Sequence, residues 1–591
     1  MAEKFVTGGV GRDGPTDQNP SVRPDLHLDD GDLGLLDGDR GEGARIAMEL
    51  IVGAAKAVGA DRLLDISGAH VDGCLYHGQA GLDFAQRLVG SGATVAVPTT
   101  LNVSTLDLLH PERFRGDPEL AAQGRRLMDA YVEMGCRPTW TCSPYQLIER
   151  PSFGDQVAWA ESNAIVFANS VLGARTGRYG DFIDICAAIT GRAPAAGLHL
   201  DAGRRARLVV RLEGVPDDWL ADDALYPVLG HLLGRVAGSR VPVVVGLPPD
   251  TDEDRLKALG AAAASAGSVA MFHAVGVTPE APTLEDALGD LEPESEVSVD
   301  PTLLEAAAAE LSTTSGGRLD AVCLGTPHAS RAELAELAGM FGGGKVRVDT
   351  YVNAGRGDIS TARSDVEILE AAGVRLVSDT CTYITPILDP AARVVMTDSA
   401  KWAWYAPANL GVEVMFGSRR DCVASAIAGE VRRESPLRPG GGPVRWEEFA
   451  LIDQQETARG VLVPGRAAGP ALPLHQPLSF WGGIDPTVGL IIDPHHPQLG
   501  ESITGRVVVM PAGRGSSSSS SVLAESLRLG TGPAAIVLSE RDVIIAVGAI
   551  AAFELYGVVC PVVVVAPEEA PSVSGVPVAV VAGDGELNVV W

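Results

Sequence analysis

Three cysteines of this chain lie where predicted β-strands end, in positions that suit a metal site. Cys142 ends the stretch 137–142, Cys323 lies near the end of 319–325, and Cys381 ends 374–381. Ligands of open α/β sheets bind beyond the carboxyl ends of the strands, so thiols far apart in sequence can meet there. Three thiolates with an open fourth position suit an iron–sulfur cluster or a Lewis-acidic iron. The alternative is that each thiol is a small buried apolar residue.

The run GRGSSSSSS, residues 513–521, joins a predicted strand ending at Met510 to a helix predicted from about Val522. Backbone N–H groups at the start of a helix favour a carboxylate or a phosphate above its N-terminus. Arg514 adds positive charge there, and a serine hydroxyl in such a place can be activated to take a proton. The alternative is a flexible low-complexity loop, which serine runs usually form.

A predicted helix from about Asp155 to Leu172, ended by Gly173, carries polar residues that a purely structural helix does not need. Glu161 is followed by a Ser-Asn pair at 162–163, and an Asn-Ser pair follows at 169–170 on the same face. Asn and Ser compete with the helix backbone for hydrogen bonds, so this face is typical of a polar pocket wall. A surface helix with solvated amides is an equally good interpretation.

Further polar candidates follow other predicted strands. A lone histidine is more often satisfied in the core or on the surface than catalytic. Lys401 stands between a small polar run and Trp402 and Trp404, where a partly desolvated ammonium would meet an anion. These candidates are His70, His77, Asn102, His328 and Lys401.

The order of predicted elements is mostly strand, loop and helix in alternation, which predicts an α/β fold with mostly parallel sheets. Residues 1–26 are rich in Gly, Pro and Asp, and we expect a disordered extension. Residues 27–433 form the large part, with several α/β modules. A Pro- and Gly-rich linker is expected at 434–473, and a compact small domain with the serine run at 474–591.

The net charge of −30 makes nucleic acid and anionic membranes unfavourable partners. A local Lys or Arg pocket can still bind a small anion, because salt screens the distant charge. The eight cysteines form no paired CxxC spacing, so a metal site must be assembled from distant segments. With no apolar run of about 20 residues, we expect a soluble, cytoplasmic protein.

Several of these stretches together resemble the aconitase X family, a divergent branch of the aconitase superfamily. The similarity extends over nearly all of residues 30–570, and the chain resembles the fused form with the large part first. The segments that carry it are AHVDGCLYHG, VPTTLN, TCSPYQ, WAESNAIVFANSVLGARTGRYGD, MFHAVGVTPEAP, LGTPHAS, SDTCTYI, SAKWAWYAP and GRGSSSSSSVLAE.

The resemblance implies an aconitase-like catalytic part of three α/β modules and a C-terminal swivelling domain, with a dehydratase site between them. It implies an iron–sulfur cluster, of the two-iron type, or a mononuclear iron, held by Cys142, Cys323 and Cys381. Some relatives carry Cys where this chain has Thr326, so Cys323 takes over that role or the ligand set differs.

By the same resemblance, Ser516 is the base that removes the proton next to the substrate carboxylate. Arg514, the loop amides and Lys401 could stabilise the charge that develops at that carboxylate. We expect the substrate to contact seven further residues: His77, Asn102, Glu161, Ser162, Asn163, Arg514 and Ser517.

The function that this resemblance implies is removal of water from a small hydroxy acid, cis-3-hydroxy-L-proline, to give Δ1-pyrroline-2-carboxylate. One alternative keeps the chemistry and takes mevalonate 5-phosphate as substrate. Another is an iron-responsive binding or regulatory protein, although the negative charge disfavours RNA. The chain could act as a monomer or a homo-oligomer.

Overall fold

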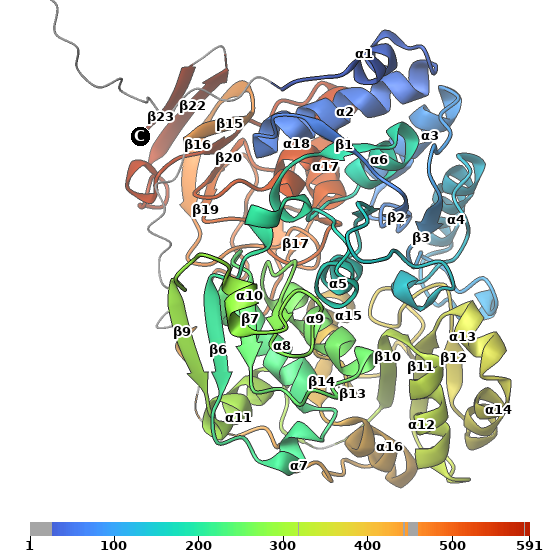
Figure 1. Ribbon diagram of the computed structural model, residues 1–591. Coiled ribbons are helices and arrows are strands. Elements are labelled where there is room, and N and C mark those ends of the chain that lie inside the picture. The colour runs from blue at the N-terminus through green and yellow to red at the C-terminus, as the bar shows by residue number, and fades with distance from the viewer. Residues whose placement is uncertain (1–25, 317, 441, 443, 447–458, 584–585) are drawn as a thin grey trace, which may run out of the picture.

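The computed structural model describes residues 26–591 apart from 317, 441, 443, 447–458 and 584–585. The predicted disordered extension, residues 1–26, therefore lies outside the described residues except for Leu26. Three α/β modules and a C-terminal domain make up the described chain (Figure 1). None of the described helices has the length and apolar character that a bilayer-spanning helix needs.

The first module contains a parallel three-stranded sheet in the order β3-β2-β4 and an antiparallel pair, β1-β5. Its helices are α1 (Asp30–Asp37), α2 (Glu42–Val58), α3 (Gln79–Gly90), α4 (Pro118–Glu133), α5 (Ser162–Phe167) and α6 (Ile183–Thr190). Its strands are β1 (Leu63–Asp65), β2 (Ala69–Val71), β3 (Thr99–Leu101), β4 (Ala158–Trp159) and β5 (Arg192–Pro194).

The helix predicted from Asp155 begins later, because residues 158–159 form β4 beside β2. Glu161 is the N-cap of α5, and its carboxylate accepts the N–H of Ala164 at 2.9 Å. The last turn, Ala168–Leu172, is a π-helix that ends at Gly173 in the left-handed conformation, as predicted for the C-cap. The predicted helix is thus right at its end and wrong at its start.

The second module is a parallel sheet in the order β8-β7-β6-β9. Helices α8 and α9 pack closely because α8 carries glycine at the contact: a Cβ at Gly230 would lie 2.1 Å from Leu259 O. The strands are β6 (Leu208–Leu212), β7 (Pro242–Val245), β8 (His273–Ala274) and β9 (Ser295–Val299). The helices are α7 (Asp217–Leu220), α8 (Leu225–Ala237), α9 (Glu253–Ala266), α10 (Leu284–Leu288) and α11 (Pro301–Glu310).

The third module is a parallel sheet in the order β12-β11-β10-β13-β14, and its buried central strands are typical of a sheet covered on both faces. The strands are β10 (Ala321–Ala329), β11 (Asp349–Ala354), β12 (Arg375–Val377), β13 (Val394–Thr397) and β14 (Glu413–Phe416). The helices are α12 (Arg331–Phe341), α13 (Arg356–Thr361), α14 (Arg363–Ala372), α15 (Ala400–Leu410) and α16 (Arg419–Ala428).

The small domain is built on a seven-stranded sheet in the order β15-β21-β20-β19-β16-β22-β23. Residues 460–473, predicted as linker, instead form β15 and β16 of this sheet, because alternating small and apolar residues pair there with β21, β19 and β22. Its strands are β15 (Gly460–Val463), β16 (Gly465–Pro473), β19 (Val507–Met510), β20 (Ala535–Leu538), β21 (Val562–Val564), β22 (Pro577–Gly583) and β23 (Glu586–Val590). A hairpin of β17 (Ile484–Asp485) and β18 (Leu490–Ile491) and two helices, α17 (Ser519–Leu529) and α18 (Val543–Tyr556), complete it.

Helices of the small domain lie against the first module: α18 packs on α2, and α17 packs on α3 (Figure 1). Helix α5 lies where the modules meet and contacts α9 of the second module. This arrangement brings the serine run, at the start of α17, to the boundary with the large part.

Candidate functional site

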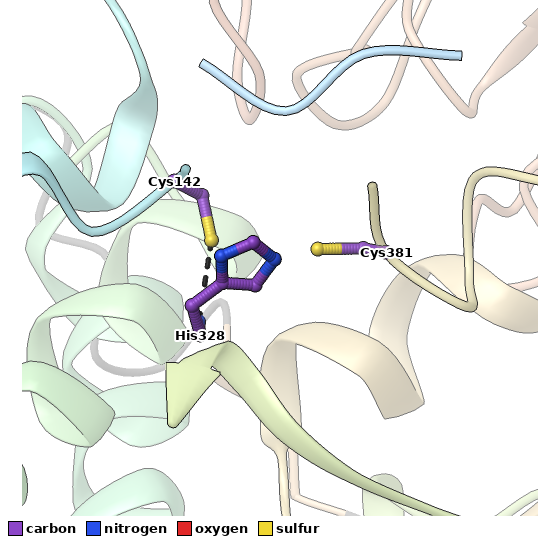
Figure 2. A group of neighbouring side chains, drawn as sticks. All are labelled: Cys142, His328 and Cys381. Atoms are coloured by element: carbon purple, nitrogen blue, oxygen red, sulfur yellow. Dashed lines mark hydrogen bonds between the residues drawn. The ribbon is translucent and has the colours of Figure 1, made fainter. Parts of the chain in front are cut away.

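Two of the three predicted cysteines, Cys142 in a loop and Cys381 beyond the end of β12, meet His328 of β10 (Figure 2). The strand predicted for 137–142 is absent apart from an isolated bridge between Arg137 and Thr100. The thiols of Cys142 and Cys381 and a ring nitrogen of His328 lie within 4.8 Å of one another, and all three residues are buried. The backbone N–H of His328 also donates to Cys142 Sγ at 3.3 Å. The segments that carry them come from the first and third modules, so the site exists only when these modules pack together.

Cys323 lies outside this group. It belongs to the buried interior of β10, and burial raises the pKa of its thiol to about 12. The structure gathers two of the predicted thiols with the imidazole of His328, so we propose His328 as a ligand in place of Cys323. Cys323 and His328 share β10, but the pairing of this strand with β11 shifts register between Leu324 and Ala329, so the two residues lie on either side of an irregularity.

The two thiols differ in acidity because they are hydrogen-bonded to each other. Burial opposes ionisation of Cys142, but the Cys381 thiol and the nearby charges of His328 and Lys401 lower the pKa of Cys142 well below its ordinary value. The same hydrogen bond, together with burial, raises the pKa of Cys381. One thiolate is thus available in this group before any metal arrives.

The donor set fits iron or an iron–sulfur cluster, because thiolates and imidazole are ligands that these centres accept. Both ring nitrogens of His328 have partners: Nδ1 lies 3.1 Å from Thr141 Oγ1, and Nε2 lies 3.1 Å from Thr380 O. A metal bound by the ring would replace one of these hydrogen bonds and leave the other to orient the imidazole.

A buried ion pair joins helices α5 and α15 beside the thiols. Lys401 Nζ donates to Glu161 Oε1, and Asn163 donates to Glu161 and to Cys142 O, the latter at 3.0 Å. Burial alone would lower the pKa of Lys401, but the Glu161 carboxylate raises it well above its ordinary value. The ammonium is thus held protonated next to the thiol group. The sequence predicted that this ammonium would meet an anion, and in the structure the Glu161 carboxylate is that partner.

The serine run meets the first module through Asp72, which the sequence analysis did not single out. Ser517 and Ser518 donate to Asp72 Oδ2 at 2.5 and 3.1 Å, and Asn102 donates to Oδ1. By contrast, Ser516 is half-buried, and its hydroxyl accepts the N–H of Ser518 at 3.2 Å. The sequence signal for Asp72 was a carboxylate directly after a strand, in the segment AHVDG. It was missed because His70 and His77 on either side of it were chosen as the candidates.

Two further carboxyl groups surround Asp72. Burial, and then the charge of Asp72, raise the pKa of Asp181 well above its ordinary value, while burial raises that of Asp184 to about 7. Asp184 accepts the N–H groups of Asp72 and Gly73 at 2.8 and 3.0 Å, and Asp181 accepts the hydroxyl of Ser521. Like charges this close disfavour each other, and the raised pKa values of Asp181 and Asp184 reduce the negative charge beside Asp72.

A small cavity of about 10 Å³ separates the serine run from α5. Ser162 lines it from the large part, Ser517 and Gly515 line it from the small domain, and Arg178 and Tyr179 stand at its edge. That volume corresponds to about one water molecule. The predicted residues Ser162 and Ser517 therefore face one space at the domain boundary.

Arg514 and His77 have other surroundings than predicted. Arg514 pairs with Asp493 and donates to Pro477 O at 2.7 Å, so its charge is neutralised within the small domain. The Nδ1 atom of His77 accepts the indole N–H of Trp481 at 3.3 Å, and burial lowers the pKa of this imidazole to about 3. Among the described residues, His77 Nε2 has no hydrogen-bond partner.

The fold and this site define a multi-module α/β protein in which a small domain lies over a thiol-rich site of a large part. Family models for aconitase X match four segments in succession: the first domain at 25–202, the second at 206–309, the third at 319–428 and the swivel domain at 457–589. The chain belongs to the aconitase X family, which confirms the resemblance and the fold class predicted from the sequence.

Among similar proteins, the cis-3-hydroxy-L-proline dehydratases of Pseudomonas aeruginosa and Hypocrea jecorina are 44% and 43% identical. These alignments cover 68% and 70% of this chain and 70% of each relative. The large subunit of Methanothermobacter thermautotrophicus phosphomevalonate dehydratase is 38% identical over 66% of this chain and 96% of its own length. The crystal structure of Thermococcus kodakaraensis aconitase X (holo-form) has a TM-score of 0.61 and 33% identity, covering 68% of this chain and all of its own.

Proposed function

We propose that this protein is a hydro-lyase that removes water from cis-3-hydroxy-L-proline. The two relatives that are 44% and 43% identical over 412 and 422 residues carry that activity in their names, whereas the large subunit of the phosphomevalonate dehydratase is 38% identical. The observation that carries the proposal is the contact of Ser517 with Asp72 across the domain boundary, above a buried Lys401–Glu161 pair and the thiol group.

Ser517, with Asp72 behind it, is the proton acceptor in this proposal. Ser517 lines the cavity with Ser162, whereas the hydroxyl of Ser516 accepts the N–H of Ser518. As Ser517 Oγ takes the proton from C2 of the substrate, its own proton passes to Asp72 Oδ2. The sequence-based choice of Ser516 is thus moved by one residue.

The electrons of the broken C2–H bond form the C2=C3 double bond, and the C3–O bond breaks. Lys401 is the donor for the departing oxygen, which leaves as water once protonated, and Glu161 holds the ammonium in place. The resulting enamine tautomerises to Δ1-pyrroline-2-carboxylate. Cys142, Cys381 and His328 would hold iron or an iron–sulfur cluster, which when bound supplies a Lewis acid that weakens the C3–O bond.

The test is an anaerobic preparation with iron and sulfide analysis, assayed by ultraviolet absorbance with cis-3-hydroxy-L-proline and with mevalonate 5-phosphate. We expect turnover of the first compound and iron bound to the chain. Turnover of mevalonate 5-phosphate alone would assign the other substrate. Absence of both activities in an iron-loaded sample would remove the hydro-lyase proposal.

A further inference from the structure

The cavity between Ser162 and Ser517 is too small for a proline ring, so the described arrangement is a closed one. A larger pocket of about 340 Å³ lies next to it, between the first and second modules and the small domain. Arg178 and Tyr179 line both spaces. A substrate that enters from the larger pocket therefore passes Arg178 before it reaches Ser517.

Arg178 belongs to the large part, but its hydrogen-bond partners are in the small domain. Its Nη1 lies 3.2 Å from Asp542 Oδ2, and its Nη2 lies 3.4 Å from Gly515 O. Charge-assisted hydrogen bonds are commonly 2.7–2.9 Å, so both contacts are long. The guanidinium thus bridges the two parts across the entrance to the inner cavity with loose contacts.

Asp542 does not depend on Arg178. It is the N-cap of α18, where Oδ1 accepts the N–H groups of Ile544 and Ile545 at 2.9 and 3.2 Å, and Oδ2 accepts the N–H of Gly513 at 3.1 Å. The start of a helix stabilises a carboxylate through these bonds and the helix dipole. Arg178 can therefore leave Asp542 without stranding a buried charge.

The substrate brings a carboxylate that needs a cation, because negative charge spreads onto it as C2 loses its proton. The two cations predicted for this task are neutralised by other partners, Lys401 by Glu161 and Arg514 by Asp493. Of the described residues that line the inner cavity, Arg178 is the one with a charged side chain. Its planar fork also matches a carboxylate in a bidentate geometry.

We propose that Arg178 exchanges Asp542 for the carboxylate of the substrate, so that one side chain closes the entrance in the empty enzyme and anchors the substrate in the occupied one. The proposal rests on the proposed dehydratase function. In this proposal Arg178 is a substrate-binding residue, and Asp542 competes with the substrate carboxylate for it.

The competition predicts opposite effects for the two partners in the iron-loaded enzyme. Arg178→Ala should raise KM for cis-3-hydroxy-L-proline by about 100-fold, and Arg178→Lys by about tenfold, because lysine keeps the charge but loses the fork. Asp542→Asn should lower KM two- to fivefold, about the strength of a partly exposed ion pair. Asparagine keeps the Oδ1 cap of α18 but loses the acceptor for the N–H of Gly513, so the melting temperature of this variant is measured beside its KM. If the Arg178–Asp542 contact only stabilised the fold, both the Arg178 and the Asp542 variants would have a higher KM or a lower melting temperature.

Arg87 offers a matched control, because its Nη1 also reaches across the boundary, to Glu554 O at 2.8 Å, but on an exposed edge away from the cavity. Arg87→Ala should leave KM unchanged. A rise in KM with Asp542→Asn, or an Arg178→Ala effect no larger than that of Arg87→Ala, would overturn the exchange.

A binding measurement separates this inference from the reaction itself. L-proline should inhibit the wild-type enzyme, whereas L-prolinamide, which lacks the carboxylate, should inhibit it far less; Arg178→Ala should remove that difference. Equal discrimination by the variant would refute the role of Arg178 while the dehydratase function stands. Inactivity of the wild type on cis-3-hydroxy-L-proline would refute the function itself, and calorimetric titration with the same two compounds would still test the anchor.

Discussion

The thiol side and the serine side of this site are built in different ways. Cys142, His328 and Cys381, with Lys401 and Glu161, all belong to the large part, and their partners lie there too. Ser517 belongs to the small domain, but its hydroxyl is satisfied by Asp72 of the first module. The first half is complete within the large part, whereas the second half forms only when the small domain lies against it.

This difference suggests a division of labour. A metal-binding half needs rigid geometry, which packed strand ends provide. A half that must admit and release substrate is better placed on a domain that can move. The two halves should therefore fail in different ways when single residues are changed.

The largest expected effect is loss of metal from the thiol side. Cys142→Ser or Cys381→Ser should abolish turnover and reduce bound iron to background, because a hydroxyl is a poor replacement for a thiolate ligand. Iron per chain, measured chemically, and the visible absorption of the purified protein check this. Cys323→Ser is the matched control and should keep its iron. Loss of iron from the Cys323 variant as well as from the other two would restore the ligand set predicted from the sequence.

On the serine side, Ser517→Ala should lower kcat by about 10³- to 10⁴-fold, as expected when a proton acceptor is removed, with iron content unchanged. Ser516→Ala should stay within about tenfold of wild type, because its hydroxyl serves a backbone N–H. The two variants differ by one position in the same run. If only the Ser516 variant is inactive, the base is the residue that the sequence suggested.

A smaller loss, about 10²-fold in kcat, is expected for Asp72→Asn, because the amide still accepts hydrogen bonds from Ser517 but cannot take its proton. Asp181→Asn is the control: its carboxyl also meets the serine run, through Ser521, but burial keeps it protonated. Asparagine resembles a neutral carboxyl in shape, so kcat should change little. Equal losses in both variants would indicate a general disturbance of the boundary.

The smallest effect concerns stability in acid. Burial lowers the pKa of His199 to about 3 from an ordinary value of 6.5, and this imidazole accepts N–H and O–H groups of Gly177 and Tyr179 at the boundary. Between pH 6.5 and 3 the unfolded chain binds the extra proton, so its contribution to stability is lost as pH falls through that window.

The expected slope is about 1.4 kcal/mol per pH unit for this site. His199→Gln should flatten the pH dependence of the unfolding free energy by roughly that amount, whereas the exposed His475→Gln should not. Denaturant titrations at several pH values measure the slope. An unchanged slope in the His199 variant would show that this imidazole is protonated in the folded chain.

Sequence reasoning reached much of the site because the motifs are local. The cysteines at predicted strand ends, the GRGSSSSSS run, and Glu161, Ser162 and Asn163 beside the C-cap Gly173 were all visible as residue types at fixed spacing. It missed Asp72, and it gave His328 the weight of any lone histidine, because nothing along the chain says which polar side chains will face each other.

What the sequence by itself determined is the set of modules, their α/β character and the segments that carry chemistry, since hydrophobic periodicity and turn chemistry act over a few residues. The tertiary structure alone decided the pairings: Lys401 with Glu161, Arg514 with Asp493, Ser517 with Asp72, and His328 in place of Cys323 beside the thiols. These partners are tens to hundreds of residues apart. Folding of the small domain brings Arg514 to Asp493, and the packing of separate modules brings the other groups within hydrogen-bond distance.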